Sequence, residues 1–265
     1  MAQGPLDIPR VRQGLASRRL GRKIHYFPLI DSTNSCARRL AEDGAADGDV
    51  VIAESQSHGR GRLGRAWISP PSLNLYLSAV LRPALPASAA PQLTLMAAVA
   101  LADTVALFCD TEPSIKWPND VLLEGKKIAG VLAESSCAAE RIEFVILGIG
   151  VNLNYPAELM PEAIRDRATS LMIVRGQPVE REAFLRRLIQ DLDRCYGELE
   201  EKGFGAIAQR WDARFNLKGK KIRVAMEDET LVGTAVGIDP EGALVVLDSG
   251  GASRRVFAGD VTPAE

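Results

Sequence analysis

A glycine- and arginine-rich run contains the residues best suited to chemistry. Three glycines and three arginines share the seven positions 59–65, called here the Gly-Arg loop. Glycine lets the backbone approach a ligand closely, and arginine stays charged and presents a fork that fits carboxylate and phosphate oxygens. The run therefore predicts a loop that wraps an anion. A solvated surface turn and an RNA-contacting arm use the same residue types, and both stay open at this point.

Two further polar segments flank one predicted hairpin. Lys116 and Asp120 bracket Pro118, and an ordinary ion pair across a turn would explain them. Lys126 and Lys127 follow the next turn, and a solvated hairpin tip would explain these two. Because Lys116 and Asp120 bracket a proline and Lys127 begins a strand of apolar residues, we expect at least one lysine of these two segments to point into the protein or into a cleft. A lysine placed there needs an anionic partner.

Two helices and a strand are expected ahead of the Gly-Arg loop. The first helix is short and spans residues 11–20. Ser32 and Thr33 supply the start of the second helix, whose apolar residues fall at helical spacing until Gly44. Residues 49–54 predict a short buried strand that leads into the loop.

The remainder of the chain alternates between strand and helix patterns. Residues 73–79 alternate apolar with polar side chains, so we expect a strand with two different faces. Residues 155–176 are irregular, and we expect a mobile loop there. The other expected elements are helices at 91–109, 181–201 and 204–215, and strands at 114–117, 121–123, 128–135, 142–153, 221–225, 230–238, 243–247 and 254–257.

These elements predict an α+β fold. Helices lie on one face of a mixed, mostly antiparallel sheet, and the short strands after residue 216 form a small β-barrel. The expected domains are a short N-terminal segment at 1–23, without room for a complete winged helix, a main domain at 24–215 and a C-terminal domain at 216–265.

The composition indicates a folded, soluble protein in which any basic site is local. The 265 residues are 46% hydrophobic and carry a net charge of -2, so nothing attracts the chain as a whole to nucleic acid or to an anionic membrane. No stretch reaches about 18 uninterrupted apolar residues and no secretory signal pattern is present, so we expect no membrane span and a cytoplasmic location. The four cysteines are far apart, and we expect four isolated buried thiols.

Five motifs together resemble the biotin protein ligase family of the bacterial type, and they occur in the order typical of that family. The close resemblance covers residues 31–154, and a looser one links the strands after residue 216 to the SH3-like module of the family. The motifs are Asp31-Ser32-Thr33-Asn34, Glu54-Ser55-Gln56 with the Gly-Arg loop, Lys116-Trp117-Pro118-Asn119-Asp120, Lys127-Ile128-Ala129-Gly130 and Gly148-Ile149-Gly150-Val151-Asn152.

The resemblance implies a class II synthetase-like fold and a two-step reaction. Biotin carboxylate attacks the α-phosphorus of ATP, giving biotinyl-5'-adenylate and pyrophosphate, and a lysine of a biotin carboxyl carrier protein then displaces AMP. ATP and Mg²⁺ are the implied co-substrate and metal. Family members commonly pair, which leaves a homodimer open, and the short N-terminal segment leads us to expect no DNA partner. Both groups that react first are anions, so positioned Arg and Lys must counter their repulsion.

The site residues follow from the resemblance, position by position. We expect Lys127, Arg62 and Asp120 to be catalytic, with Lys127 as the principal electrostatic catalyst and Asp120 orienting or deprotonating the acceptor lysine. The residues expected to bind biotin are Ser32, Thr33, Asn34, Gln56, Arg60, Gly61, Arg62, Lys127 and Gly130. The residues expected to bind ATP or the adenylate are Arg62, Arg65, Trp67, Lys116, Asn119, Lys127 and Asn152. The resemblance identifies no metal ligand.

Two other functions compete with biotin ligation. A lipoate protein ligase or octanoyltransferase shares the fold and the adenylation or acyl-transfer logic, but the Gly-Arg loop, the Lys-Trp-Pro-Asn-Asp motif and the C-terminal strands favour biotin. An RNA-binding protein could use the loop as a basic arm, but the chain is slightly acidic and has no pattern of stacking aromatics beside the loop. We therefore expect a biotin ligase.

Overall fold

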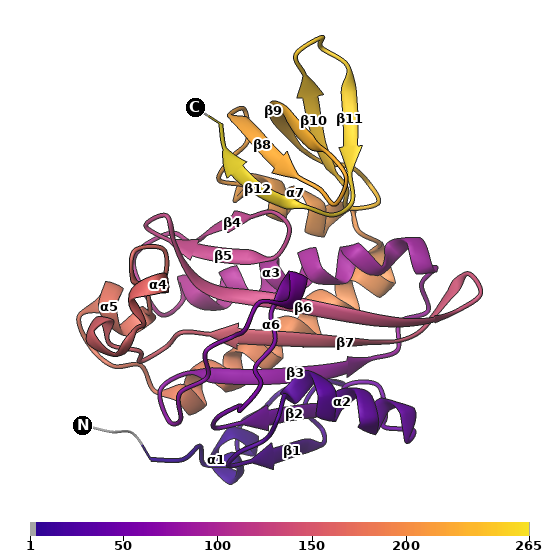
Figure 1. Ribbon diagram of the computed structural model, residues 1–265. Coiled ribbons are helices and arrows are strands. Elements are labelled where there is room, and N and C mark those ends of the chain that lie inside the picture. The colour runs from indigo at the N-terminus through magenta and orange to yellow at the C-terminus, as the bar shows by residue number, and fades with distance from the viewer. Residues whose placement is uncertain (1–3, 265) are drawn as a thin grey trace.

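The larger of the two sheets formed by the described residues has seven strands. In the computed structural model, which describes residues 4–264, their order is β1-β2-β3-β7-β6-β5-β4. β1 is parallel to β2, and the other neighbouring pairs are antiparallel, so the expected mixed, mostly antiparallel sheet is confirmed (Figure 1). The strands are β1 (Ile24–Phe27), β2 (Val50–Ala53), β3 (Leu75–Leu81), β4 (Ser114–Lys116), β5 (Asp120–Leu123), β6 (Lys126–Ala138) and β7 (Arg141–Val151).

Two long helices, α3 and α6, cover one face of this sheet. They pack against each other, and α3 contacts β6 and β7 (Figure 1). Three short helical turns lie in the segment expected to be an irregular loop, at residues 155–176. The helices are α1 (Ile8–Arg12), α2 (Thr33–Glu42), α3 (Ala90–Ala106), α4 (Glu162–Arg165), α5 (Leu171–Arg175), α6 (Arg181–Lys202) and α7 (Gly205–Ala213), with tighter 3-10 turns η1 (Arg62–Gly64), η2 (Ala87–Ala89) and η3 (Ala157–Leu159).

The shorter helix α2 lies on the opposite face of the sheet, so the expected placement of helices on one face holds for α3 and α6 but not for α2. It begins at the predicted position, because the Ser32 side chain accepts a hydrogen bond from the backbone N–H of Ser35. Ala37 packs against Val80 of β3, whereas Leu77 of β3 belongs to the core on the other face. The alternation predicted for this strand is therefore present, but both of its faces are buried, since helices cover each of them.

The apolar composition of α3 follows from its place in the core. Residues 87–106 are long and apolar enough to cross a membrane by length and composition alone, with a mean hydropathy of 1.4. In this structure 67% of that stretch is buried inside the protein, between the sheet and the helices α6 and α7. A helix that is enclosed by protein must be apolar on all sides, so the core accounts for the composition.

The C-terminal strands form a second, five-stranded sheet at one end of the molecule (Figure 1). Its order is β11-β10-β9-β8-β12, with every neighbouring pair antiparallel, as suits a small SH3-like β domain. The sequence analysis did not predict β12. Val261 is the one buried residue in this strand, and its four residues are too few to show an alternating apolar pattern. The strands are β8 (Lys221–Ala225), β9 (Thr230–Ile238), β10 (Leu244–Asp248), β11 (Ser253–Val256) and β12 (Asp260–Pro263).

Two sequence-based expectations are wrong in detail. The first helix is not at residues 11–20, because α1 begins after Asp7, whose side chain caps it, and the chain leaves the helix before Gly14, which has a left-handed φ of 86°. All four cysteines are free, but Cys137 is exposed and Cys109 only partly buried. Cys137 lies near the end of β6, where the β6–β7 hairpin extends past the helices (Figure 1).

A buried ion pair ties the start of α6 to the end of β2. The Arg181 guanidinium donates to the Glu54 carboxylate at 2.9 Å, and their side chains are 1% and 5% exposed. The same carboxylate accepts from the backbone N–H of Leu6 at 2.6 Å and from the Tyr26 hydroxyl at 3.1 Å. Burial, together with Glu54, raises the pKa of Tyr26 to about 12. The pair therefore anchors the strand that leads into the Gly-Arg loop.

Replacing Arg181 by methionine is expected to lower the free energy of unfolding by about 3–5 kcal/mol, because a buried carboxylate loses its charged partner. Arg10 and Glu180 form a matched exposed pair near the same helix start, with side chains 58% and 47% exposed. Arg10→Met is expected to cost about 1 kcal/mol or less. Urea unfolding measures both variants, and equal destabilisation of the two would contradict the anchoring role.

Candidate active site

A cavity with a volume of about 670 Å³ opens beside the middle of the seven-stranded sheet. Its wall combines the start of α2, the Gly-Arg loop, the β5–β6 hairpin, β7 and the C-terminal β12. All the predicted site residues lie on this wall: Ser32, Thr33, Asn34, Gln56, Arg60, Gly61, Arg62, Arg65, Trp67, Lys116, Asn119, Asp120, Lys127, Gly130 and Asn152. The structure thus brings the five motifs together, while the role of each residue stays a prediction.

One end of the cavity is a hydrogen-bonded group of hydroxyls and amides. The Gln56 side-chain oxygen accepts from the backbone N–H of Thr33 at 2.8 Å and from its hydroxyl at 3.1 Å. The Gln56 amide donates to the Ser69 hydroxyl at 2.9 Å, and buried Ser78 lies within 2.9 Å of the Thr33 hydroxyl. These side chains hold one another in place, so this end presents fixed donors and acceptors to a polar ligand.

Glycines on two strands make the space for this end of the cavity. A Cβ on Gly148 would come closer than 3.0 Å to the Asn34 amide, and a Cβ on Gly150 would come as close to the Trp67 ring. Gly130 on the neighbouring strand also faces Trp67. The Gly-x-Gly motif therefore leaves room for side chains that arrive from α2 and from the segment after the Gly-Arg loop.

The Gly-Arg loop is closed on itself by its backbone. The N–H of Gly61 donates to the carbonyl of Arg65 at 2.7 Å, and the N–H of Trp67 donates to the carbonyl of Gly59 at 2.9 Å. At the tip, Leu63 and Gly64 both have left-handed φ angles, of 55° and 71°. The closed loop directs its arginines toward the cavity wall.

Two loop arginines meet residues of the C-terminal sheet. Arg65 pairs with Asp260 at 2.6 Å, and Arg62 donates to the carbonyl of Gly259 at 3.2 Å and to the Asn119 side chain at 3.3 Å. Burial lowers the pKa of Arg62 from its ordinary value, against the opposing effect of Asp120 and Asp260. Burial tends to raise the pKa of Asp260, but the hydrogen bond and charge of Arg65 outweigh it, and that pKa lies below its usual value.

Lys127 is the lysine that turns toward the cavity, as expected for one of the hairpin pair, while Lys126 is exposed. Its ammonium lies 2.6 Å from an Asp120 carboxylate oxygen and 5.3 Å from the centre of the Trp67 ring. The contact with Asp120 is an ion pair rather than a well-aligned hydrogen bond, since that oxygen has no hydrogen-bond partner among residues 4–264. The predicted anionic partner of Lys127 is therefore Asp120.

Residues of the segment 155–176 complete the wall behind Lys127. The N–H of Lys127 donates to the carbonyl of Arg167 at 2.8 Å, and the N–H of Thr169 donates to the carbonyl of Lys127 at 2.9 Å. The Asn152 amide donates to the carbonyl of Thr169 at 3.0 Å. Sequence reasoning missed Arg167 and the C-terminal Asp260 as wall residues, because neither belongs to a motif.

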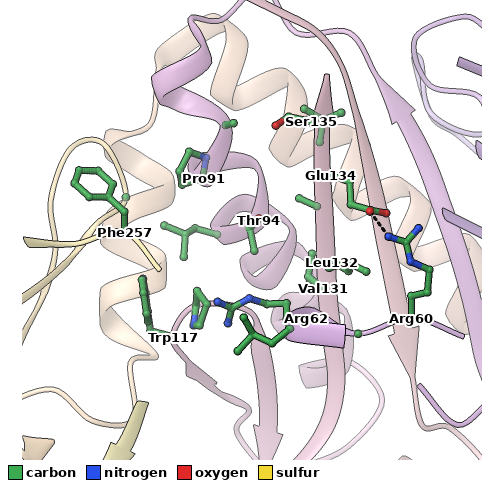
Figure 2. Close-up of a pocket in the computed structure, with 18 of the residues that line it drawn as sticks. Arg60, Arg62, Pro91, Thr94, Trp117, Val131, Leu132, Glu134, Ser135 and Phe257 are labelled. Carbon is green, nitrogen blue, oxygen red and sulfur yellow. Dashed lines mark hydrogen bonds and ion pairs between the residues drawn. The ribbon is translucent and has the colours of Figure 1, made fainter. Parts of the chain in front are cut away.

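A second cavity, of about 480 Å³, also borders the Gly-Arg loop (Figure 2). Arg60 and Arg62 line both cavities. Figure 2 shows Trp117 and Phe257 across the second cavity from Arg60, with Pro91 of α3 above Trp117.

Comparison with known proteins first defines the class. Residues 26–152 match the biotin/lipoate A/B protein ligase family, and residues 219–262 match the biotin protein ligase C terminal domain. The structure is similar to a solved biotin protein ligase from Aquifex aeolicus in complex with biotin and ATP. That similarity has a TM-score of 0.79 and 27% identity, and it covers 92% of this chain and 100% of the other.

Two relatives narrow the class further. The biotin--[acetyl-CoA-carboxylase] ligase of Paracoccus denitrificans is 39% identical over 232 residues, which are 86% of this chain and 94% of that protein. The protein of the same name from Mycobacterium tuberculosis is 35% identical over 264 residues, which are 97% of this chain and 95% of that protein. This chain belongs to the biotin protein ligase family, which confirms the resemblance noted in its motifs.

Proposed function

We propose that this protein activates biotin with ATP as biotinyl-5'-AMP and transfers the biotinyl group to a lysine of a biotin carboxyl carrier protein. One observation carries the proposal: a single cavity joins the polar end around Thr33 and Gln56 to a cationic wall that reaches Lys127. A carboxylic acid held at the polar end would direct its carboxylate toward these cations. The names of the two relatives support biotin as that acid.

In the first step, the biotin carboxylate attacks the α-phosphorus of ATP and pyrophosphate leaves. Lys127 and Arg62 would offset the negative charge that gathers at the reacting centre, since preorganised cations in a partly water-excluded site act strongly there. Trp67 offers an apolar ring beside Lys127, and Asn152 lies on the same part of the wall. Arg65 and Lys116 would extend the cationic wall along the phosphates.

Mg²⁺ is the metal that ATP would bring to this site. Among residues 4–264 no group of three His, Cys, Asp or Glu side chains could hold a metal ion by itself. Mg²⁺ is usually held by one or two carboxylates together with substrate phosphates, and Asp120 on the cavity wall fits that donor set. When bound, the ion would neutralise charge on the phosphates.

The second step needs a neutral amine. A lysine has an ordinary pKa near 10.4, so the acceptor lysine must lose a proton before it displaces AMP. Asp120 is the carboxylate beside Lys127 and would take or orient that proton. We also propose a cytoplasmic location, no DNA partner and a homodimer as the assembly to test by light scattering.

The proposed domains are an N-terminal segment at 1–23, a biotin- and ATP-binding catalytic domain at 24–215 and an SH3-like domain at 216–265. The two sheets fall on either side of the second boundary, which supports it. α1 packs against α6, so the N-terminal segment shares the core of the catalytic domain.

Labelled biotin, MgATP and a biotin carboxyl carrier domain test the function directly. The label is expected to become covalently attached to the carrier, and a carrier whose acceptor lysine is replaced by arginine should stay unlabelled. Competition with lipoate separates the nearest alternative, because a lipoate ligase would lose biotin labelling when lipoate is added. Absence of transfer to any carrier, together with salt-sensitive RNA retention, would refute biotin ligation.

Gly148→Ala is expected to raise the KM for biotin by about tenfold, because the new methyl group displaces the Asn34 amide. The matched control is Gly197→Ala in the middle of α6, where an added Cβ meets nothing within 4 Å. Steady-state pyrophosphate release measures both variants. An unchanged KM for biotin in Gly148→Ala would show that this strand does not shape the biotin end.

A further inference from the structure

Glu134 on β6 connects the Gly-Arg loop with the polar end of the cavity. One oxygen of its carboxylate forms an ion pair with Arg60 (Figure 2), and the other accepts from the Asn34 amide at 2.7 Å. The Glu134 side chain is 19% exposed, and Asn34 is 4% exposed. A half-enclosed carboxylate thus holds one group from the loop and one from α2.

The charge of Glu134 and the Leu132 carbonyl, which accepts from the same Asn34 nitrogen at 3.3 Å, together decide which way the Asn34 amide is turned. A carboxylate only accepts hydrogen bonds, so the NH₂ group of Asn34 must face it, and the Asn34 oxygen must face the other way. That oxygen lies 2.6 Å from the hydroxyl of Ser78, which is fully buried. Ser78 has one hydroxyl proton, and it donates this proton to the Asn34 oxygen.

Ser78 lies beside a second group of hydrogen bonds, around Thr33 and Gln56. The Thr33 hydroxyl, 2.9 Å from Ser78, donates to the Gln56 side-chain oxygen, which also accepts the Thr33 backbone N–H. The Gln56 amide faces Ser69. Glu134 therefore fixes the Asn34 amide and the Ser78 hydroxyl, which lie against the groups at the polar end.

We propose that Glu134 is a positioning residue for biotin. It fixes the Asn34 amide at the polar end and holds Arg60 of the loop beside it. This inference rests on the proposed function, because it assumes that biotin occupies the polar end. Lys127 and Asn152 contact Asp120 and Thr169 instead, so Glu134 should not affect the nucleotide.

Glu134→Gln tests this role, because glutamine has the same size and one oxygen in place of two. Whichever way its amide turns, one of Arg60 and Asn34 meets an NH₂ group. We expect the KM for biotin in biotin-dependent ATP–pyrophosphate exchange to rise about tenfold or more, the effect of one charge-assisted hydrogen bond. The KM for ATP should change less than about twofold.

Glu143→Gln is the matched control on the same hairpin, where an exposed glutamate accepts from the Ser136 hydroxyl and lies outside the cavity wall. Both KM values should match those of the wild type. Glu134→Asp keeps the charge with a shorter reach, and we expect an intermediate KM for biotin. Should Glu134→Gln fail to fold, the Glu134→Asp variant alone tests the positioning role. A wild-type KM for biotin in Glu134→Asp would then overturn the role.

Three results would count against the inference. An unchanged KM for biotin in Glu134→Gln would overturn it, and so would an equal rise in the KM values for biotin and ATP, which indicates general damage to the site. In both cases, biotin-dependent exchange by the wild-type protein still supports the proposed function. Wild-type protein without biotin-dependent exchange would instead refute the proposed function, and the positioning role with it.

Discussion

Replacing Lys127 by methionine is expected to slow biotin-dependent ATP–pyrophosphate exchange by about 10²- to 10³-fold, the usual cost of removing a preorganised group that stabilises developing charge. The first step brings a carboxylate onto a phosphate, and Lys127 lies on the wall of the cavity with its ammonium 2.6 Å from Asp120. Backbone hydrogen bonds with Arg167 and Thr169 hold its backbone to the segment behind it, so little rearrangement is needed to meet a substrate.

Lys126→Met is the matched control for this prediction. Lys126 precedes Lys127 on the same hairpin but is exposed and lies outside the cavity wall. Its loss should leave exchange within about twofold of the wild-type rate, since a single exposed charge contributes little. Undiminished exchange in Lys127→Met, or equal losses in both variants, would rule out Lys127 as the main electrostatic catalyst.

Asp120→Asn is expected to slow transfer from preformed adenylate by about 10²- to 10⁴-fold, the range typical of general base catalysis. Asparagine keeps the size of the side chain but cannot take a proton from the acceptor lysine. Because Asp120 also pairs with Lys127 and is the carboxylate proposed to hold Mg²⁺, exchange in the first step should fall as well, though by no more than about tenfold, since asparagine keeps one oxygen. Single-turnover transfer and pyrophosphate exchange measure the two steps separately.

The dependence on pH sharpens the test of Asp120. In Asp120→Asn only an acceptor amine that is already neutral reacts. The rate of transfer should therefore rise about tenfold per pH unit below the ordinary lysine pKa near 10.4. The wild-type rate should rise less steeply. Glu124→Gln, an exposed carboxylate at the tip of the same hairpin, serves as the control. Unchanged transfer in Asp120→Asn would remove this residue from the second step.

The family resemblance predicted the site residues that belong to its five motifs, and short-range rules predicted where some of them lie in the helices and strands. Ser32 and Thr33 carry a helix-cap signal, and Lys127 stands where a turn meets an apolar strand, so their local positions follow from short-range rules. By contrast, Glu134 and Asp260 reach the site through tertiary packing across 74 and 195 residues from Arg60 and Arg65. Nothing in their own neighbourhoods marks them.

The fold, too, was predicted where the sequence pattern is long and not where the pattern is short or where tertiary packing decides. The long helices α3 and α6 were predicted because their apolar patterns extend over many turns. α1 was misplaced, since in a helix of five residues a cap at Asp7 and a left-handed Gly14 outweigh the apolar pattern. The face on which α2 lies was not predictable, because an apolar stripe shows that a helix packs on something but not on which side of a sheet.

The pairing of Arg65 with Asp260 bears on how the protein is made. The two residues are 195 positions apart, so a growing chain exposes the Gly-Arg loop long before its partner strand exists. Domains generally fold as units during synthesis, with N-terminal parts first. The sheet that carries Lys127 can thus form early, while the wall closes only when β12 has joined β8. Assembly of the last strand is then the event that turns a folded chain into a complete enzyme.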